Sequence, residues 1–132
     1  MKLNERSEKN LVGVHPDLEK AVRKAAELTA VSFIVTEGVR TLERQRQLVA
    51  KGAAQTLRSR HIPENNQSRM SCAVDLAAVV GGQVRWDWPL YERLAVAMKM
   101  AAQAVGVPLE WGGDWRSFKD GPHFQLPWQT YP

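Results

Sequence analysis

The stretch Ala73-Val74-Asp75-Leu76-Ala77-Ala78-Val79-Val80-Gly81-Gly82-Gln83-Val84-Arg85-Trp86 decides the fold of this chain. Up to Val80 it is apolar except for Asp75, and a short apolar run bounded by a turn predicts a buried strand. Gly81-Gly82 is a two-residue hairpin signal, so the residues that follow are expected to return antiparallel to the strand. An unpaired carboxylate in a buried strand is costly. Asp75 therefore needs a cation or hydrogen-bond donors nearby.

The segments on both sides complete a mixed architecture. Apolar residues at helical spacing predict helices over 15–28, 41–51 and 90–105, and glycines close the last two. Short apolar runs predict strands over 32–36, 107–111 and 123–126, and the polar residues 52–71 are expected to form a long loop. Because helices and strands do not alternate regularly, we expect an α+β fold with helices packed on a small, mostly antiparallel sheet.

The composition is that of a globular protein. The 132 residues are 44% hydrophobic and 24% charged, with a formal net charge of +4. This length predicts a single domain over residues 1–132. No apolar run approaches the roughly 20 residues that span a bilayer, and the start of the chain lacks the features of a secretory signal. Cys72 is the only cysteine, which excludes an internal disulfide. We therefore expect synthesis in a reducing cytoplasm and no stable membrane insertion.

Two histidines and an acid offer a metal site. Together with Asp75, His61 and His123 provide two imidazoles and one carboxylate, and three protein ligands with an open fourth position describe catalytic zinc. Asp120 precedes His123 by three residues and is a candidate general base, and later acid, for the attacking water. Taken singly, a histidine is more often a surface or core residue. Cys72 is expected to be a small buried thiol, with metal ligation as the alternative.

Arg40 and two tryptophans are the remaining candidates for the site. Arg40 lies at the end of a predicted strand, where a guanidinium could bind a substrate carboxylate or a developing oxyanion. An ordinary ion pair with Glu37 or Glu43 is the alternative. Trp111 and Trp115 flank glycines near the proposed site, so they are expected to line a substrate groove or to pack in the core.

These residues resemble the motifs of the zinc peptidases that include D-alanyl-D-alanine carboxypeptidases and the phage endolysins with L-alanyl-D-glutamate endopeptidase activity. The family pattern S-x-H-x-x-G-x-A-x-D is met by Ser59, His61, Ala73 and Asp75. The closing D/E-x-x-H is met by Asp120 and His123. The element G-x-R-T-x-x-x-Q is met by Gly38, Arg40, Thr41 and Gln45, and Trp111-Gly112-Gly113-Asp114-Trp115 is similar to the endolysin branch. The sequence departs from this pattern in two ways. Extra residues are inserted between His61 and Asp75, and Ser71 stands in place of the glycine.

The resemblance implies a fold of the Hedgehog/DD-peptidase type and a role for each matching residue. It implies that zinc is bound by His61, Asp75 and His123. It implies that Asp120 is the catalytic acid and base, and that Arg40 stabilises the oxyanion or holds a substrate carboxylate. Substrate-binding roles are expected for Arg40, Ser59, Gln45 and Trp115.

The resulting expectation is an endolysin, a zinc-dependent endopeptidase that cleaves the L-alanyl-D-glutamate bond of peptidoglycan stem peptides and lyses the bacterial host. We expect a monomer without a separate cell-wall-binding domain or signal peptide, made in the host cytoplasm and acting in the periplasm or cell wall after release. Its basic surface would favour contact with the anionic envelope. One alternative is a D-alanyl-D-alanine carboxypeptidase or dipeptidase with the same site. The other is a non-catalytic module that binds envelope or nucleic acid, which the scattered basic residues disfavour.

Overall fold

The strand predicted around Asp75 is the centre of the fold. The computed structural model describes residues 1–132 and contains one five-stranded sheet. The strands are β1 (Ser32–Glu37), β2 (Ala73–Val80), β3 (Gln83–Arg85), β4 (Glu110–Trp111) and β5 (His123–Gln125). The α-helices are α1 (Glu5–Leu11), α2 (Pro16–Leu28), α3 (Leu42–Ala50) and α4 (Trp88–Val105), and the short 3-10 helices are η1 (Pro63–Asn65) and η2 (Gly112–Asp114).

Strand β2 pairs on both of its edges, and every pairing in the sheet is antiparallel. One edge carries β1, with Val35 opposite Leu76. The other edge is shared, because β5 pairs with the first half of β2 and β3 pairs with the second half across Gly81-Gly82. Both turn glycines have positive φ, as the hairpin requires. The predicted α+β fold with an antiparallel sheet is confirmed.

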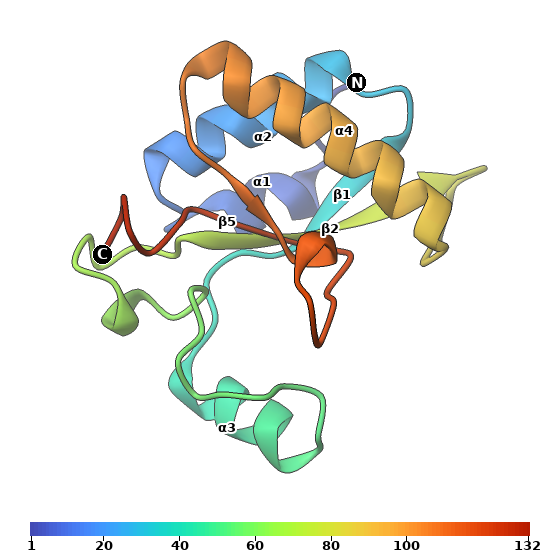
Figure 1. The fold of residues 1–132 in the computed structure, drawn as a ribbon. Helices are drawn as coiled ribbons and strands as arrows, with labels where there is room; N and C mark the ends of the chain where they lie inside the picture. The colour runs from blue at the N-terminus through green and yellow to red at the C-terminus, as the bar shows by residue number, and fades with distance from the viewer.

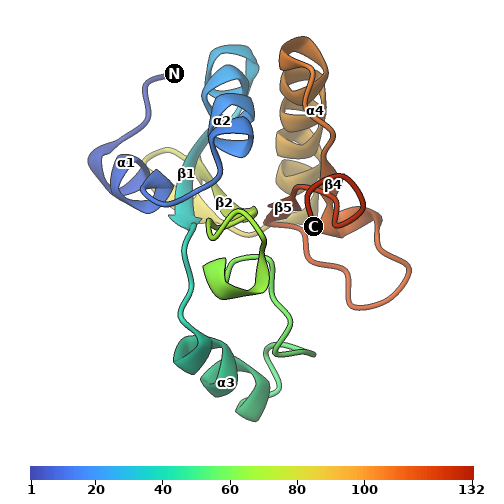
Figure 2. The same cartoon turned by 90° about the vertical axis from the view of Figure 1, so that its left-hand side faces the viewer.

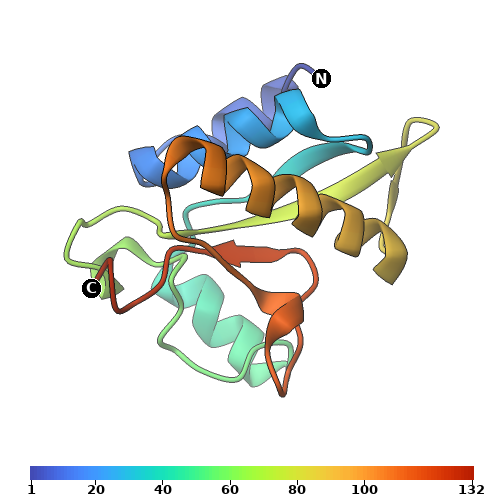
Figure 3. The same ribbon diagram turned by 45° about the horizontal axis from the view of Figure 1, so that its top comes forward.

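Helices α2 and α4 pack together on one face of the sheet (Figures 1 and 2). Strand β2 runs alongside α4 and continues into the β3 hairpin (Figure 3). Successive strand side chains face opposite sides of a sheet, so Val74 and Leu76 point into the core while Asp75 points away from it. That core is one cluster of 23 buried residues. One face of β2 thus builds the core, and the other faces α3 and the long loops. None of the helices has both the length and the apolar character that crossing a membrane requires.

The predicted helix ends agree with the capping residues. Helix α2 begins at Pro16, and His15 is its N-cap, with Nδ1 accepting a hydrogen bond from the N–H of Asp17 at 3.1 Å. His15 therefore has a structural role. Helix α4 ends at Gly106, whose φ of +73° is the left-handed conformation that favours glycine at a helix C-terminus.

Helix α1 was not predicted from the sequence. It is short, and its side chains complete the outer edge of β1: the Ser7 hydroxyl accepts a hydrogen bond from Val35 N–H at 2.9 Å, and Asn10 Nδ2 donates to Val35 O at 2.8 Å. Asn4 caps the helix by accepting from Ser7 N–H. A seven-residue helix is marginal by itself, so these tertiary contacts, rather than an apolar period, stabilise it.

Candidate metal centre and active site

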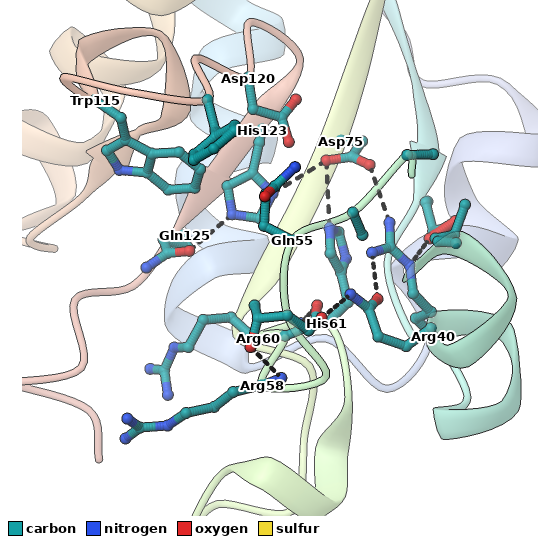
Figure 4. Close-up of a pocket in the computed structure, with 18 of the residues that line it drawn as sticks. Arg40, Gln55, Arg58, Arg60, His61, Asp75, Trp115, Asp120, His123 and Gln125 are labelled. Atoms are coloured by element: carbon teal, nitrogen blue, oxygen red, sulfur yellow. Dashed lines mark hydrogen bonds and ion pairs between the residues drawn. The ribbon is translucent and has the colours of Figure 1, made fainter. Parts of the chain in front are cut away.

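His61, Asp75 and His123 meet on the face of the sheet opposite to the core (Figure 4). Asp75 and His123 are direct cross-strand partners on β2 and β5, so the sheet register holds them together. His61 comes from the loop after α3, and its carbonyl oxygen accepts a hydrogen bond from Arg40 N–H at 3.0 Å. One potential ligand atom of each residue lies within 4.8 Å of the other two. The structure thus brings together the three side chains that the sequence singled out as ligands.

Hydrogen bonds fix which nitrogen of each histidine faces the centre. His61 Nδ1 lies 2.8 Å from Gly38 O, and a carbonyl oxygen only accepts, so Nδ1 carries the proton. His123 Nε2 lies 2.8 Å from Gln125 Oε1 and is protonated for the same reason. The remaining nitrogens, His61 Nε2 and His123 Nδ1, each lie 3.3 Å from Asp75 Oδ1. Both imidazole lone pairs are therefore directed at the position where a cation would sit.

This donor set fits a divalent metal ion. Two imidazole nitrogens and one carboxylate oxygen are the ligand types and the number that catalytic zinc sites use, with a fourth position open to water or substrate. His61 is 1% exposed and His123 is 7% exposed, so both are held in place by packing. His61, Asp75 and His123 would be the ligands of the ion.

Two residues that the sequence did not single out, Gln125 and Glu110, hold His123 in place through hydrogen bonds. Gln125 is two residues further along β5 and is buried on the same face. Its Nε2 donates to Glu110 Oε2 at 3.2 Å, across the β4–β5 pair. The Glu110 carboxylate can only accept, so it fixes the Gln125 amide with Oε1 toward His123. The spacing of two residues between His123 and Gln125 could have indicated Gln125 from the sequence, because it places both side chains on the same face of a strand.

The residues inserted between His61 and Asp75 form a loop whose two ends lie side by side. Where the ends meet, Arg60 O accepts a hydrogen bond from Cys72 N–H at 2.9 Å. Inside it, the buried Asn66 amide donates to backbone carbonyl oxygens within the same loop. The loop therefore leaves and returns without displacing the strand that carries Asp75.

Ser71, which replaces the glycine of the family pattern, is buried beside the Gly38 carbonyl oxygen that accepts a hydrogen bond from His61. Its hydroxyl lies 2.9 Å from Gly38 O, the same carbonyl oxygen that accepts from His61, and 2.8 Å from Ala73 O. Gly38 itself has no room for a side chain, because a Cβ there would lie 2.0 Å from Asn10 O. Ser71 therefore adds a polar contact to the carbonyl that orients His61.

Cys72 does not belong to the metal group. Its side chain is 1% exposed and lies in the core cluster, on the opposite side of the strand from Asp75. An odd number of positions separates the two residues, so the pleat points their side chains apart. The predicted buried thiol is confirmed, and the alternative of Cys72 as a metal ligand is wrong.

Arg40 uses all of its nitrogens within the site. Its Nε pairs with Glu37, Nη1 donates to Gln45 Oε1 at 2.8 Å, and Nη2 lies 3.5 Å from Asp75 Oδ2. The ion pair with Glu37 that the sequence offered as an alternative is present. Arg40 also contacts the outer oxygen of Asp75, which leaves Oδ1 to face the histidines. The Arg40 side chain is 12% exposed, so solvent screens its charge only weakly.

Asp120 lies in the same cleft as the three potential ligands (Figure 4). Its carboxylate takes part in no ion pair or hydrogen bond within the chain, and its backbone N–H donates to Gly112 O at 3.0 Å. A Cβ on Gly112 would lie 2.4 Å from Asp120 O, so glycine permits this approach. The glycine-rich segment thus places a free carboxylate beside the metal group.

The two carboxylates of the site have opposite electrostatic environments. Burial alone would raise the pKa of Asp75, but when the imidazoles of His61 and His123 are protonated on both nitrogens, their positive charge and hydrogen bonds outweigh burial and hold that pKa far below the ordinary value. Burial, together with the negative charge of Asp75, raises the pKa of Asp120. Neighbouring carboxylates whose pKa values are pushed apart are typical of a pair in which one binds and the other transfers protons.

The cleft around the centre has a volume of about 920 Å³. Ser59, Gln45 and Trp115, predicted to bind substrate, all line it. Trp115 lies with its ring 5.2 Å from the His123 ring, and Ser59 Oγ accepts from His61 N–H at 3.1 Å. Both ends of the Gln45 amide are engaged, by Arg40 and by Thr56 O.

Of the two roles expected for Trp111, packing in the core is confirmed and lining the groove is wrong. Trp111 stacks on Phe124 in the core, and its Nε1 donates to Gly121 O at 2.7 Å. Its side chain therefore packs on the core side of β4, while the cleft lies on the other side. Trp128 also lines the cleft.

Comparison with known proteins agrees with this geometry. Residues 1–126 match the family model described as phage L-alanyl-D-glutamate peptidase. The L-alanyl-D-glutamate peptidase of Escherichia phage T5 is 30% identical, over 98% of this chain and 92% of that protein. The crystal structure of the Serratia marcescens L-Ala D-Glu endopeptidase ChiX has a TM-score of 0.88 at 45% identity, covering 98% of this chain and 92% of that one.

A more distant structure bears on the fold alone. The vancomycin-resistance D,D-dipeptidase VanXYg has a TM-score of 0.51 at 17% identity, covering 86% of this chain and 50% of that one. This likeness agrees with the predicted fold type. The metal-ligand geometry, the family match over most of the chain and the two close relatives lead to one conclusion: the chain belongs to the phage L-alanyl-D-glutamate peptidase family.

Proposed function

We propose that this protein is a zinc-dependent peptidoglycan endopeptidase that hydrolyses the L-alanyl-D-glutamate bond of the stem peptide. The observation that carries the proposal is the set of His61, Asp75 and His123 ligand atoms within 4.8 Å of one another, in a cleft that also holds an unpaired Asp120. Family membership supports the choice of bond. Such an enzyme would act as an endolysin on the host cell wall after synthesis in the host cytoplasm, with residues 1–132 as one catalytic domain.

Zinc held by these three residues would act as a Lewis acid that polarises the scissile carbonyl and acidifies the attacking water. Asp120 would take the proton of that water and return it to the leaving amino group. Its carboxylate has no partner in the chain to compete for that proton, and its raised pKa suits the exchange. Arg40 would place positive charge near the carbonyl oxygen as negative charge develops there.

The remaining cleft residues would position the substrate and the catalytic groups. We assign Trp115 and Ser59 to contact with the stem peptide, because both line the cleft beside a ligand histidine. Gln45 is 2% exposed and holds both Arg40 and the loop at Thr56. Its proposed contribution to substrate binding is therefore through Arg40.

The test is digestion of purified peptidoglycan by protein equilibrated with zinc, followed by mass analysis of the products. We expect stem peptides with a new amino-terminal glutamate. Loss of a terminal alanine instead would indicate a D-alanyl-D-alanine carboxypeptidase, and intact stems would overturn the proposal.

Metal analysis of three variants tests the ligands separately from the activity. We expect His61→Ala and His123→Ala to lose most of the bound zinc, because each removes one of three ligands. Cys72→Ala is the matched control and should keep its zinc, since that thiol faces the core. Full zinc content in either histidine variant would contradict the assignment.

A further inference from the structure

The backbone around Asp120 decides where its carboxylate lies, because that carboxylate has no hydrogen-bond or ion-pair partner in the chain. The Asp120 N–H donates to Gly112 O at 3.0 Å. The carbonyl oxygen of the following residue, Gly121, accepts a hydrogen bond from Trp111 Nε1 at 2.7 Å. Trp111 is the only side chain that forms a hydrogen bond with residues 120–122. Its indole N–H is therefore the one side-chain anchor of the segment that carries Asp120.

Trp111 is a rigid donor. It pairs with Phe124 across β4 and β5, and the two rings stack with their centres 6.4 Å apart. The Trp111 side chain is 9% exposed and belongs to the core cluster. Close packing fixes the orientation of the ring, and with it the direction of the N–H.

Gly121 also lies against a second aromatic ring. A Cβ on Gly121 would lie 2.5 Å from Cδ2 of Tyr91, a residue of α4 that is 6% exposed. The Tyr91 ring and the Trp111 N–H thus hold the Gly121 backbone together. Two core residues fix the chain directly beside Asp120, whose side chain lines the cleft.

Loss of the indole N–H would release this backbone. A buried carbonyl oxygen without a donor is costly, and glycine can turn its carbonyl toward water because no side chain restricts its φ and ψ. Such a turn would move the adjoining Asp120. A displacement of about 1 Å can cost a catalytic group about 10²-fold in rate.

The metal ligand in the same segment is fixed by other contacts. His123 pairs with Asp75 across β5 and β2, and its ring is held by Gln125. Loss of the Trp111 N–H should therefore displace Asp120 and leave the metal ligands in place.

We propose that Trp111 is a positioning residue for proton transfer: its indole N–H, acting through Gly121 O, holds the Asp120 carboxylate where it meets the attacking water. This inference rests on the proposed function. It adds a residue that lies outside the cleft and touches neither the metal position nor the substrate. The role belongs to the N–H, because an aromatic ring without a donor would also fill the core.

The test removes the N–H and keeps an aromatic ring. In the zinc-loaded Trp111→Phe variant, we expect kcat on a soluble stem peptide to fall about 10- to 100-fold, with KM and zinc content close to wild type. Phenylalanine is smaller than tryptophan, so a second variant carries benzothienylalanine at position 111. This residue keeps the indole shape with sulfur in place of N–H, and it should lower kcat by a similar factor.

Trp88→Phe is the matched control. The Trp88 ring lies 6.4 Å from the Trp111 ring, but it is 44% exposed and donates no hydrogen bond. This variant should keep the wild-type kcat. Wild-type kcat in the benzothienylalanine variant would overturn the positioning role, and so would loss of zinc from it.

A double-mutant cycle separates positioning from general support of the fold. Because the N–H is proposed to act through Asp120, Trp111→Phe should have no further effect on kcat in the Asp120→Asn background. An equal fold-loss in both backgrounds would mean that Trp111 acts independently of Asp120, which would overturn the proposal.

Amide hydrogen exchange in the zinc-loaded proteins gives a readout that does not depend on activity. Trp111→Phe should speed exchange of the Asp120 N–H, while the Leu126 N–H, which donates to Cys72 O at 2.9 Å, should keep its protection. Unchanged exchange at Asp120 would overturn the positioning role while the proposed function stands. Absence of any cleavage by the wild-type protein would overturn both.

Discussion

Replacing Gln125 by leucine tests whether its hydrogen bond with His123 sets the metal affinity. Gln125 is 6% exposed, and it is the only partner of His123 Nε2. Leucine would leave that buried N–H without an acceptor, at a cost of about 1–3 kcal/mol. The imidazole could avoid the cost only by moving its proton to Nδ1, which would then point at the metal position. In both cases the form of the site that binds the metal becomes less stable.

The expected result is zinc binding weakened by about 10- to 100-fold, the range typical when a metal-binding histidine loses its hydrogen-bond partner. That range equals about 1.4–2.8 kcal/mol, in agreement with the cost of the orphaned N–H. The assay is competition for zinc against a chromophoric chelator at fixed pH, with unfolding of the metal-free protein measured alongside.

Two further variants make the Gln125 test specific. Gln103→Leu makes the same chemical change at an exposed position of α4 and should leave zinc affinity unchanged. The exchange Glu110→Gln with Gln125→Glu keeps an acceptor toward His123 and a complementary pair behind it, so it should recover much of the affinity. Wild-type zinc affinity in Gln125→Leu would refute the reasoning.

Three other outcomes follow from the same contacts. Asp120→Asn should lower kcat on a stem peptide by about 10²- to 10⁴-fold while zinc content stays unchanged, and loss of zinc with activity would mean a ligand role instead. Gly38→Ala should destabilise the fold by roughly 1–3 kcal/mol or more in denaturant unfolding, because its Cβ would lie 2.0 Å from Asn10 O; wild-type stability would contradict that clash. Burial and the hydrogen bond to Asp17 raise the pKa of Tyr131 from 10.0 to about 12, so its contribution to stability is complete below pH 10 and is lost as pH rises toward 12. The stability difference between wild type and Tyr131→Phe should therefore shrink over that pH range, and a difference that grows would show the opposite sign of linkage.

The fold was predictable where a local pattern carried the information. The apolar run of β2, the glycine turn after it and the glycine that closes α4 each specify their own element, because strand period and positive φ are properties of short segments. Helix α1 was missed because its stability comes from Ser7 and Asn10 completing the edge of β1. Those contacts join residues 25 or more positions apart, and no local pattern records them.

The sequence by itself determined which donors the site has: the two histidines, the acid in the apolar strand and a second acid before the last histidine. The strand β2 that carries Asp75 was also predictable, because its apolar run is a property of residue type and spacing alone. These are consequences of residue type and spacing along one strand.

Only the tertiary structure decided how those donors are used. The lone pairs of His61 and His123 face the centre because Gly38 O and Gln125 Oε1, from other parts of the fold, take the opposite ring protons. Each nitrogen of the Arg40 guanidinium has a partner, in Glu37, Gln45 or Asp75, for the same kind of reason. A hydrogen bond has a direction, and that direction depends on where a distant acceptor lies, which spacing along the chain does not specify.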